Sequence, residues 1–302
     1  VMLCARLLQR PWNWALMQAN QLGEGVLWNP ADGCFWWTDI LRKRLYRHAL
    51  ASGRTDWIET PHRLCAFAFL ERAGRILAAF DTGLAFFEPD TGAVEWLHRP
   101  AELGHGMRLN DGRVDRQGRF WVGSMCEDTG VAPFGSASLY RLDPDLSLTP
   151  VLSGVGISNG ICWSVDGTRF HFADSPRQTI AVFDCDPASG ALGPARTFAE
   201  TTGDAFPDGA IIDSRDHMWS AQWGGGRVVR YDPSGAIRDE IVVPVSQPTC
   251  AAFGGEQLDF LCITSASDGL STDVLDSQPQ AGHAFIYRVD VPGVRERGFV
   301  GP

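Results

Sequence analysis

One strand-like segment recurs six times along the chain, and this repeat restricts the fold more than any other feature of the sequence. Each copy joins turn residues to a short, alternating apolar strand, and the copies end 41 to 49 residues apart. A paired strand-like segment follows, such as residues 44–47 after the first copy. The six copies are Cys34–Asp39, Arg75–Asp81, Arg119–Met125, Arg169–Asp174, His217–Trp223 and Leu258–Thr264.

A period of about 40 to 50 residues built only of short strands is typical of β-propeller blades, which bury their sheets against neighbouring blades. A β-sandwich or a large barrel also contains short strands, but neither repeats one motif six times at near-constant spacing. The sequence therefore predicts an all-β fold, a single six-bladed β-propeller over residues 1–302 with a short N-terminal extension over about residues 1–12. Inner strands of a propeller surround a central channel, where we expect the ligand site.

The overall charge and hydropathy exclude several classes of partner. The net charge is −10 and the basic residues are scattered, so the chain has no stripe that would follow a nucleic-acid backbone. Its apolar runs are shorter than the roughly 20 residues of a membrane-spanning helix, and Arg6 and Arg10 interrupt the place of a signal peptide. We predict a cytoplasmic protein with a small-molecule ligand, no nucleic-acid or membrane partner, and a monomeric or weakly homo-oligomeric state.

The eight cysteines form no CxxC pair and no zinc-ligand spacing. Six of them lie within apolar, strand-like stretches, and we predict that these are buried free thiols rather than a disulfide framework. They are Cys34, Cys65, Cys162, Cys185, Cys250 and Cys262.

Four polar clusters precede blade strands, and each places an oxygen-bearing side chain beside a glycine. Asn-Gly and Asp-Gly pairs are also common in tight turns, which is the alternative for any one cluster alone. Four clusters in register instead predict that Glu24, Asn110, Asn159 and Asp208 converge on the channel. The clusters are Leu22–Gly25, Arg108–Gly112, Ile157–Gly160 and Phe206–Gly209.

Carboxylate and carboxamide oxygens are hard ligands that suit Ca²⁺, Mg²⁺ or Mn²⁺ better than a closed structural zinc site. The histidines show neither HxH nor HExxH spacing, so the sequence does not support a zinc hydrolase of that type. A small number of protein ligands leaves coordination positions for water and substrate. The predicted channel is therefore a metal-binding channel.

Several motifs in a fixed order resemble those of the senescence-marker-protein/gluconolactonase/regucalcin (LRE-like) family of sugar lactonases, which are six-bladed propellers. The similarity runs from about Leu22 to about Arg288. The motifs are Gly23–Trp28, Arg108–Gly112 with Asp115–Arg119, Ser158–Gly160, Pro207–Gly209, Trp223–Val228, Phe253–Gly255 and Ser265–Leu270. Val26 departs from the family pattern, in which proline commonly follows Glu-Gly.

The resemblance implies one divalent cation on Glu24, Asn159 and Asp208, with Ca²⁺ preferred and Zn²⁺, Mg²⁺, Mn²⁺ and Fe²⁺ also compatible. It further implies substrate-binding roles for Arg108 and Asn110. An acidic residue after the third-blade strand also contacts substrate in some relatives, and two neighbours compete for that role here. These two are Glu127 and Asp128.

The predicted activity is metal-dependent hydrolysis of an aldono-1,4- or 1,5-lactone, such as gluconolactone, xylonolactone or arabinonolactone, to the aldonic acid. In this carboxylic-ester hydrolase, Asp208 is the expected general base. A phosphoesterase or phosphofluoridate hydrolase of the same propeller type is one alternative, and a non-catalytic, calcium-binding protein is another.

Three further features have simpler explanations. The G-x-S-x-G string at residues 156–160 precedes a strand-like segment rather than the helix of a nucleophile elbow, so Ser158 is not expected to form an acyl-enzyme. His105 either lines the cavity mouth or is solvated. Four tryptophans are expected to pack between sheets rather than stack on sugar, namely Trp36, Trp37, Trp121 and Trp219.

Overall fold

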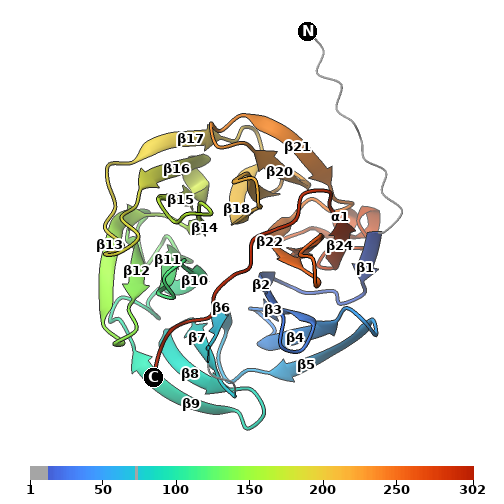
Figure 1. Ribbon diagram of the computed structural model, residues 1–302. Helices are drawn as coiled ribbons and strands as arrows, with labels where there is room; N and C mark the ends of the chain where they lie inside the picture. Colours follow the sequence, from blue (N-terminus) through green and yellow to red (C-terminus); the bar gives the residue numbers. More distant parts are fainter. Residues whose placement is uncertain (1–12, 72–73) are drawn as a thin grey trace.

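Six four-stranded antiparallel sheets surround a central axis in the computed structural model, which describes residues 13–71 and 74–302 (Figure 1). The predicted all-β, six-bladed propeller is therefore confirmed. The predicted N-terminal extension over about residues 1–12 lies outside the described residues.

The chain builds each blade from the axis outward, and we number the blades 1 to 6 by their innermost strands. The innermost strands are β2 (Gly23–Asn29), β6 (Leu64–Phe69), β10 (Met107–Val114), β14 (Ser158–Trp163), β18 (Phe206–Ile212) and β22 (Pro248–Gly254). The second strands are β3 (Cys34–Asp39), β7 (Ile76–Phe80), β11 (Phe120–Cys126), β15 (Arg169–Asp174), β19 (Met218–Trp223) and β23 (Phe260–Ser265).

The third strands are β4 (Arg44–Ala49), β8 (Gly83–Glu88), β12 (Ala137–Leu142), β16 (Thr179–Asp184), β20 (Arg227–Tyr231) and β24 (Ala284–Arg288). The outermost strands are β5 (Arg54–Glu59), β9 (Ala93–His98), β13 (Leu148–Val155), β17 (Arg196–Glu200), β21 (Ile237–Val242) and β1 (Asn13–Leu16). The described helices are the short η1 (Ser175–Arg177) and α1 (Thr272–Ser277).

The six repeated segments of the sequence are the second strands of the blades. Their predicted ends agree with the structure to within one or two residues. The sixth begins at Phe260 rather than Leu258, because Leu258 adopts a left-handed backbone conformation with φ of 53° in the preceding turn. Periodicity alone does not reveal such a turn at a leucine.

Blade 6 is completed by a strand from the other end of the chain. Strand β1 pairs with β24, with Asn13 opposite Tyr287 and Leu16 opposite Ala284. This pairing joins the two ends of the chain and covers the outer edge of β24, which would otherwise expose unpaired backbone groups. The repeat did not predict β1, because β1 precedes the first repeated segment.

Each innermost strand contains a register shift against its second strand, and the polar clusters lie at these irregularities. In blades 1 and 4 a glycine follows the polar residue and takes a left-handed conformation, with φ of 58° at Gly25 and 63° at Gly160. The clusters are therefore β-bulges inside strands rather than tight turns. A bulge redirects a side chain, here toward the axis.

Buried aspartates fix the turns between inner and second strands. In blade 3, Asp115 accepts hydrogen bonds from the backbone N–H of Gln117 at 2.9 Å and of Arg119 at 3.0 Å, and from Trp121 Nε1 at 2.9 Å. In blade 5, Asp213 accepts the equivalent bond from Trp219 Nε1 at 3.0 Å. These contacts tie each tryptophan to the turn that precedes its strand.

The four tryptophans and six cysteines that were predicted to be buried are buried in the structure. Trp36, Trp37, Trp121 and Trp219 are all buried between sheets. The described cysteines, which include all six predicted ones, are free and buried. No helix in residues 13–71 and 74–302 is long and apolar enough to cross a membrane.

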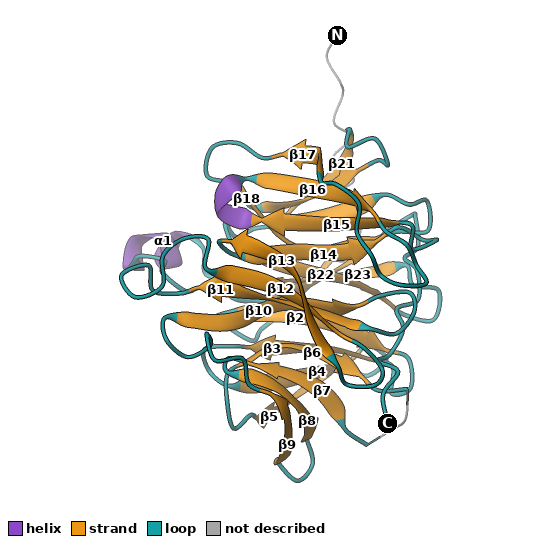
Figure 2. Cartoon of the chain, turned by 90° about the vertical axis from the view of Figure 1, so that its left-hand side faces the viewer, coloured by secondary structure: helices purple, strands orange, loops and turns teal. Residues whose placement is uncertain are grey.

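The two faces of the propeller differ. Helices η1 and α1 project from one face, on the left in Figure 2, whereas the C-terminus lies on the opposite side. The inner strands begin at the helix-bearing face, so the polar bulges lie nearer to it than to the C-terminus.

Candidate functional site

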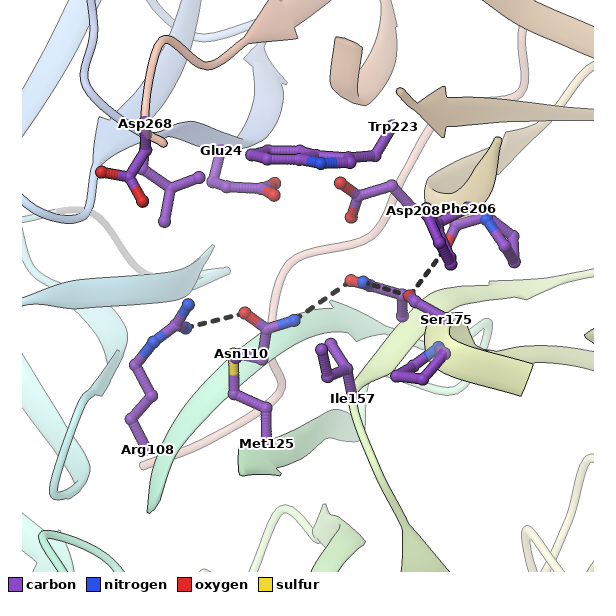
Figure 3. A pocket seen from close by; sticks show the side chains of 14 residues that line it. Glu24, Arg108, Asn110, Met125, Ile157, Ser175, Phe206, Asp208, Trp223 and Asp268 are labelled. Carbon is purple, nitrogen blue, oxygen red and sulfur yellow. Dashed lines mark hydrogen bonds between the residues drawn. The ribbon is translucent and has the colours of Figure 1, made fainter. Parts of the chain in front are cut away.

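A cavity of about 370 Å³ opens where the innermost strands begin. Five of the predicted site residues line it, and they come from blades 1, 3, 4 and 5 (Figure 3). The structure therefore brings together residues that are up to 184 positions apart in sequence. They are Glu24, Arg108, Asn110, Asn159 and Asp208.

A chain of hydrogen bonds crosses the cavity floor (Figure 3). Arg108 Nη1 donates to Asn110 Oδ1 at 2.7 Å, and Asn110 Nδ2 donates to Asn159 Oδ1 at 3.2 Å. Asn159 Nδ2 donates to Ser175 Oγ at 2.8 Å, and Ser175 Oγ donates to the carbonyl oxygen of Pro207 at 2.6 Å. Since the hydroxyl proton of Ser175 is used on Pro207, its oxygen must accept from Asn159, which determines the orientation of that carboxamide.

Two carboxylates face one another across the cavity (Figure 3). Burial, with repulsion from Asp111, raises the pKa of Glu24 to about 8. Burial, followed by repulsion from Glu24 and Asp111, raises the pKa of Asp208 well above its ordinary value. Three acidic side chains thus share a region with low exposure to water, and a positive charge there would stabilise their ionised forms.

The same region contains an unsatisfied acceptor. Asp208 is buried, and its Oδ1 atom has no hydrogen-bond partner among the described residues. A buried carboxylate oxygen without a partner is costly, and a cation is one group that would satisfy it. Glu24, Asn159 and Asp208 therefore fit a divalent cation that prefers oxygen ligands.

The donor set contains only two carboxylates, so a carboxamide must complete it. In the described part of the chain, no three His, Cys, Asp or Glu side chains are grouped in a way that would hold a metal ion. No histidine or cysteine among these described residues lines the cavity. The oxygen donors favour hard cations, as the sequence predicted.

Arg108 belongs to an ion-pair network with Glu127 and Arg63. Its Nε donates to Glu127 Oε1 at 3.1 Å, and Arg63 binds both oxygens of the same carboxylate at 2.7 and 3.1 Å. Burial acts to raise the pKa of Glu127, but hydrogen bonds and charges from the two arginines outweigh it and lower this pKa. In this structure Glu127 orients Arg108 rather than lining the cavity.

Asp128, the competing residue, does not line the cavity either. It is exposed, and its Oδ1 accepts a hydrogen bond from the Gly130 backbone at 2.9 Å within the loop. His105 is exposed and does not line the cavity, which agrees with the solvated alternative. Ser158 is fully buried, begins β14 and is not a lining residue, so the cavity offers it no route to a substrate carbonyl.

Several lining residues were not predicted as site residues. Ser175 and Asp268 add polar groups, whereas Ile157, Phe206 and Trp223 add apolar ones. Ser175 follows β15 and carries no motif of its own. Asp268 and Trp223 belong to motifs that resemble the family, and that was the signal available for them.

The fold and the cavity define a class of protein, the six-bladed propellers with an oxygen-lined pocket on the axis. The family model described as "SMP-30/Gluconolactonase/LRE-like region" matches residues 22–267. The chain belongs to this family.

Characterised relatives are similar over nearly the whole chain. An L-arabinolactonase of Azospirillum brasilense is 39% identical, over 93% of each chain. A 6-deoxy-6-sulfogluconolactonase of Pseudomonas putida is 35% identical, over 94% of this chain and 97% of the relative. The crystal structure of a calcium-binding protein, regucalcin, from Agrobacterium tumefaciens superposes with a TM-score of 0.88 at 33% identity, over 93% of this chain and 95% of that one.

Proposed function

We propose that this protein hydrolyses a sugar lactone to the open aldonic acid with the help of one divalent cation. The observation that carries the proposal is the cavity itself, in which oxygen atoms of Glu24, Asn159 and Asp208 share one pocket with Arg108 and Asn110. The lactonase names of the two relatives support the same reaction.

The cation would be held by Glu24, Asn159 and Asp208, and the calcium-binding regucalcin supports Ca²⁺ as the first candidate. When bound, such an ion acts as a Lewis acid toward a carbonyl oxygen and lowers the pKa of water. The oxygen of the attacking water bonds to the lactone carbonyl carbon, and Asp208 accepts the proton that this water loses. When the bond from that carbon to the ring oxygen breaks, Asp208 returns the proton to the ring oxygen.

Arg108 and Asn110 position the substrate. The hydrogen bonds of Arg108 to Asn110 and Glu127 hold its guanidinium in one orientation, so a lactone oxygen meets a fixed donor. Three further lining residues, Ile157, Phe206 and Trp223, carry no charged group. We propose that C–H groups of the sugar pack against these side chains, which favours pentonolactones and deoxyhexonolactones over fully hydroxylated hexonolactones.

The test measures hydrolysis of arabinono-, xylono-, glucono- and galactonolactone before and after removal of cations by a chelator. We expect turnover to be lost on chelation and restored by Ca²⁺, Mn²⁺, Mg²⁺ or Zn²⁺. Full activity in metal-free protein would contradict the metal-dependent mechanism.

The panel also includes phosphoesters and phosphofluoridates, because these are the alternative substrates for a propeller of this type. Turnover of those compounds without turnover of lactones would replace the proposed reaction. Cation binding without hydrolysis of any compound would instead favour a calcium-binding function.

A further inference from the structure

The end of the axis opposite the functional cavity is crossed by the C-terminal tail, residues 291–302 (Figures 1 and 2). The tail forms a β-bridge with blade 5 between Gly293 and Asp213, and another with blade 2 between Phe299 and Leu70. It also reaches blade 3, where Val300 N donates to the Gly118 carbonyl oxygen at 2.9 Å. The tail therefore connects blades 2 and 3 with blade 5, on the other side of the axis.

The tail delivers one carboxylate to a buried arginine on the axis. Glu296 forms an ion pair with Arg113, whose side chain is only 6% exposed. Arg113 Nη2 also donates to Cys250 Sγ at 3.7 Å, and its Nε has no partner among the described residues. A buried guanidinium needs an opposite charge, and Glu296 provides it.

Arg113 and the functional cavity are linked through Asp111. Asp111 and Arg113 both lie on β10, and this strand runs from Asn110 at the cavity floor toward the tail. The charge of Asp111 interacts with Glu24 and Asp208 on one side, and with Arg113 and Glu296 on the other. Along the axis, the acidic group of Glu24, Asp208 and Asp111 is thus followed by the positive Arg113 and then by the negative Glu296 of the tail.

We propose that Glu296 increases the affinity of the cavity for its cation by neutralising Arg113. Without Glu296, the buried positive charge of Arg113 is less compensated, and it repels a divalent ion held by Glu24 and Asp208 more strongly. The inference rests on the proposed cation site, and it makes Glu296 a positioning residue that acts through charge. Low dielectric and poor access to salt make such an effect long-ranged.

The test titrates Ca²⁺ and Mn²⁺ into chelator-treated protein by calorimetry. Glu296→Gln removes one negative charge, and we expect cation affinity to fall by roughly 3- to 30-fold. Arg113→Gln removes the positive charge, so affinity should rise. The double variant, with Arg113→Gln and Glu296→Gln, should return to within about threefold of the wild-type affinity, because the two charge changes cancel.

A matched control is Glu71→Gln, since Glu71 binds the tail at Arg297 with a distance of 3.2 Å but lies on the surface. Its cation affinity should stay within about twofold of wild type. Circular dichroism and thermal unfolding check that every variant is folded.

The direction of the changes separates charge from structural damage. A tail that only supports the fold would make both single variants weaker binders or leave binding unchanged, and either result overturns the inference. If wild-type protein itself binds no cation, the proposed cation site fails. If wild-type protein binds and the single variants match it, only the role of Glu296 fails.

Discussion

The two ends of the propeller axis are built in different ways. At one end, side chains from β-bulges of four blades face an open cavity, and their charges repel one another. At the other, the tail places Phe299 in the core and pairs Glu296 with Arg113. One end retains an unsatisfied carboxylate oxygen and repelling charges that suit a ligand, and the other pairs its buried charge within the chain. The cavity end therefore serves binding, and the tail end mainly serves the stability of the fold.

The largest expected difference is in catalysis. Asp208→Asn removes the proposed base and a charged ligand, so we expect turnover to fall by about 10²- to 10⁴-fold. Because Asp208 is buried and repelled by its neighbours, the metal-free fold should lose no stability. Kinetics with a lactone and thermal unfolding measure the two effects. Asp268→Asn, at the same cavity, is the control, and an equal loss of turnover there would contradict the assignment.

A substitution in the C-terminal tail, at the other end of the axis, is expected to lower stability instead. Phe299 is fully buried, so Phe299→Ala is expected to lower the free energy of unfolding by about 3–5 kcal/mol through the cavity that it creates. Denaturant titration measures this loss. Met17→Ala is a control on an exposed side chain and should change stability by less than about 0.5 kcal/mol. A stable Phe299→Ala variant would show that the tail is not part of the core.

A smaller effect is expected from the hydrogen-bond chain beneath the cavity. Ser175→Ala leaves Asn159 Nδ2 without its acceptor and frees the carboxamide to rotate. We expect cation affinity to fall by about 10- to 100-fold, as for other groups that orient a ligand. Calorimetry with Ca²⁺ measures it, and Ser175→Thr, which keeps the hydroxyl, should retain more of the affinity. Equal losses in the two variants would argue against the orienting role.

The last and most gradual effect is the pH dependence of the free energy of unfolding in the absence of a cation. Glu24 has a pKa of about 8 in the folded protein against 4.5 as its ordinary value, so the folded protein holds a proton that the unfolded chain releases between these values. The free energy of unfolding should therefore fall as pH rises through this window, by at most about 1.4 kcal/mol per pH unit.

Thermal unfolding of chelated protein from pH 5 to 9 measures this dependence, and Glu24→Gln is the control that lacks the titrating group. The variant should show the weaker dependence on pH. Identical slopes for the variant and the wild-type protein would show that Glu24 does not titrate as proposed. Added Ca²⁺ should also flatten the wild-type slope, because the cation competes with the proton.

The sequence predicted the fold and the candidate cavity residues more accurately than it predicted their environment. Glu24, Asn110, Asn159 and Asp208 were recognised because each lies within two residues of a glycine in a polar cluster before a blade strand. Two blades carry the same bulge without such a side chain at the cavity, at Leu64/Ala66 and at Pro248/Ala251. The repeat therefore indicates where the bulges occur, and the residue type decides which of them serve the cavity.

The sequence did not predict which residues surround Arg108. Glu127 and Asp128 were predicted to compete for one contact with substrate, and the structure adds that the Glu127 carboxylate is bound by Arg63, a residue 64 positions away with no motif to mark it. Trp219 and Trp223 occupy one strand, yet only Trp223 lines the cavity. Strand patterns indicate which face a residue occupies, but not whether the end of that strand meets solvent, core or cavity.

The sequence by itself determined the number of blades and the oxygen donors near the axis, because the repeat spacing and the Gly-flanked polar residues are local properties of the chain. Only the tertiary structure decided that β1 closes blade 6, that Ser175 orients Asn159, and that the tail brings Glu296 to Arg113. The last of these pairs joins residues 183 positions apart. Such contacts depend on how the six blades pack around one axis, and no local pattern specifies that packing.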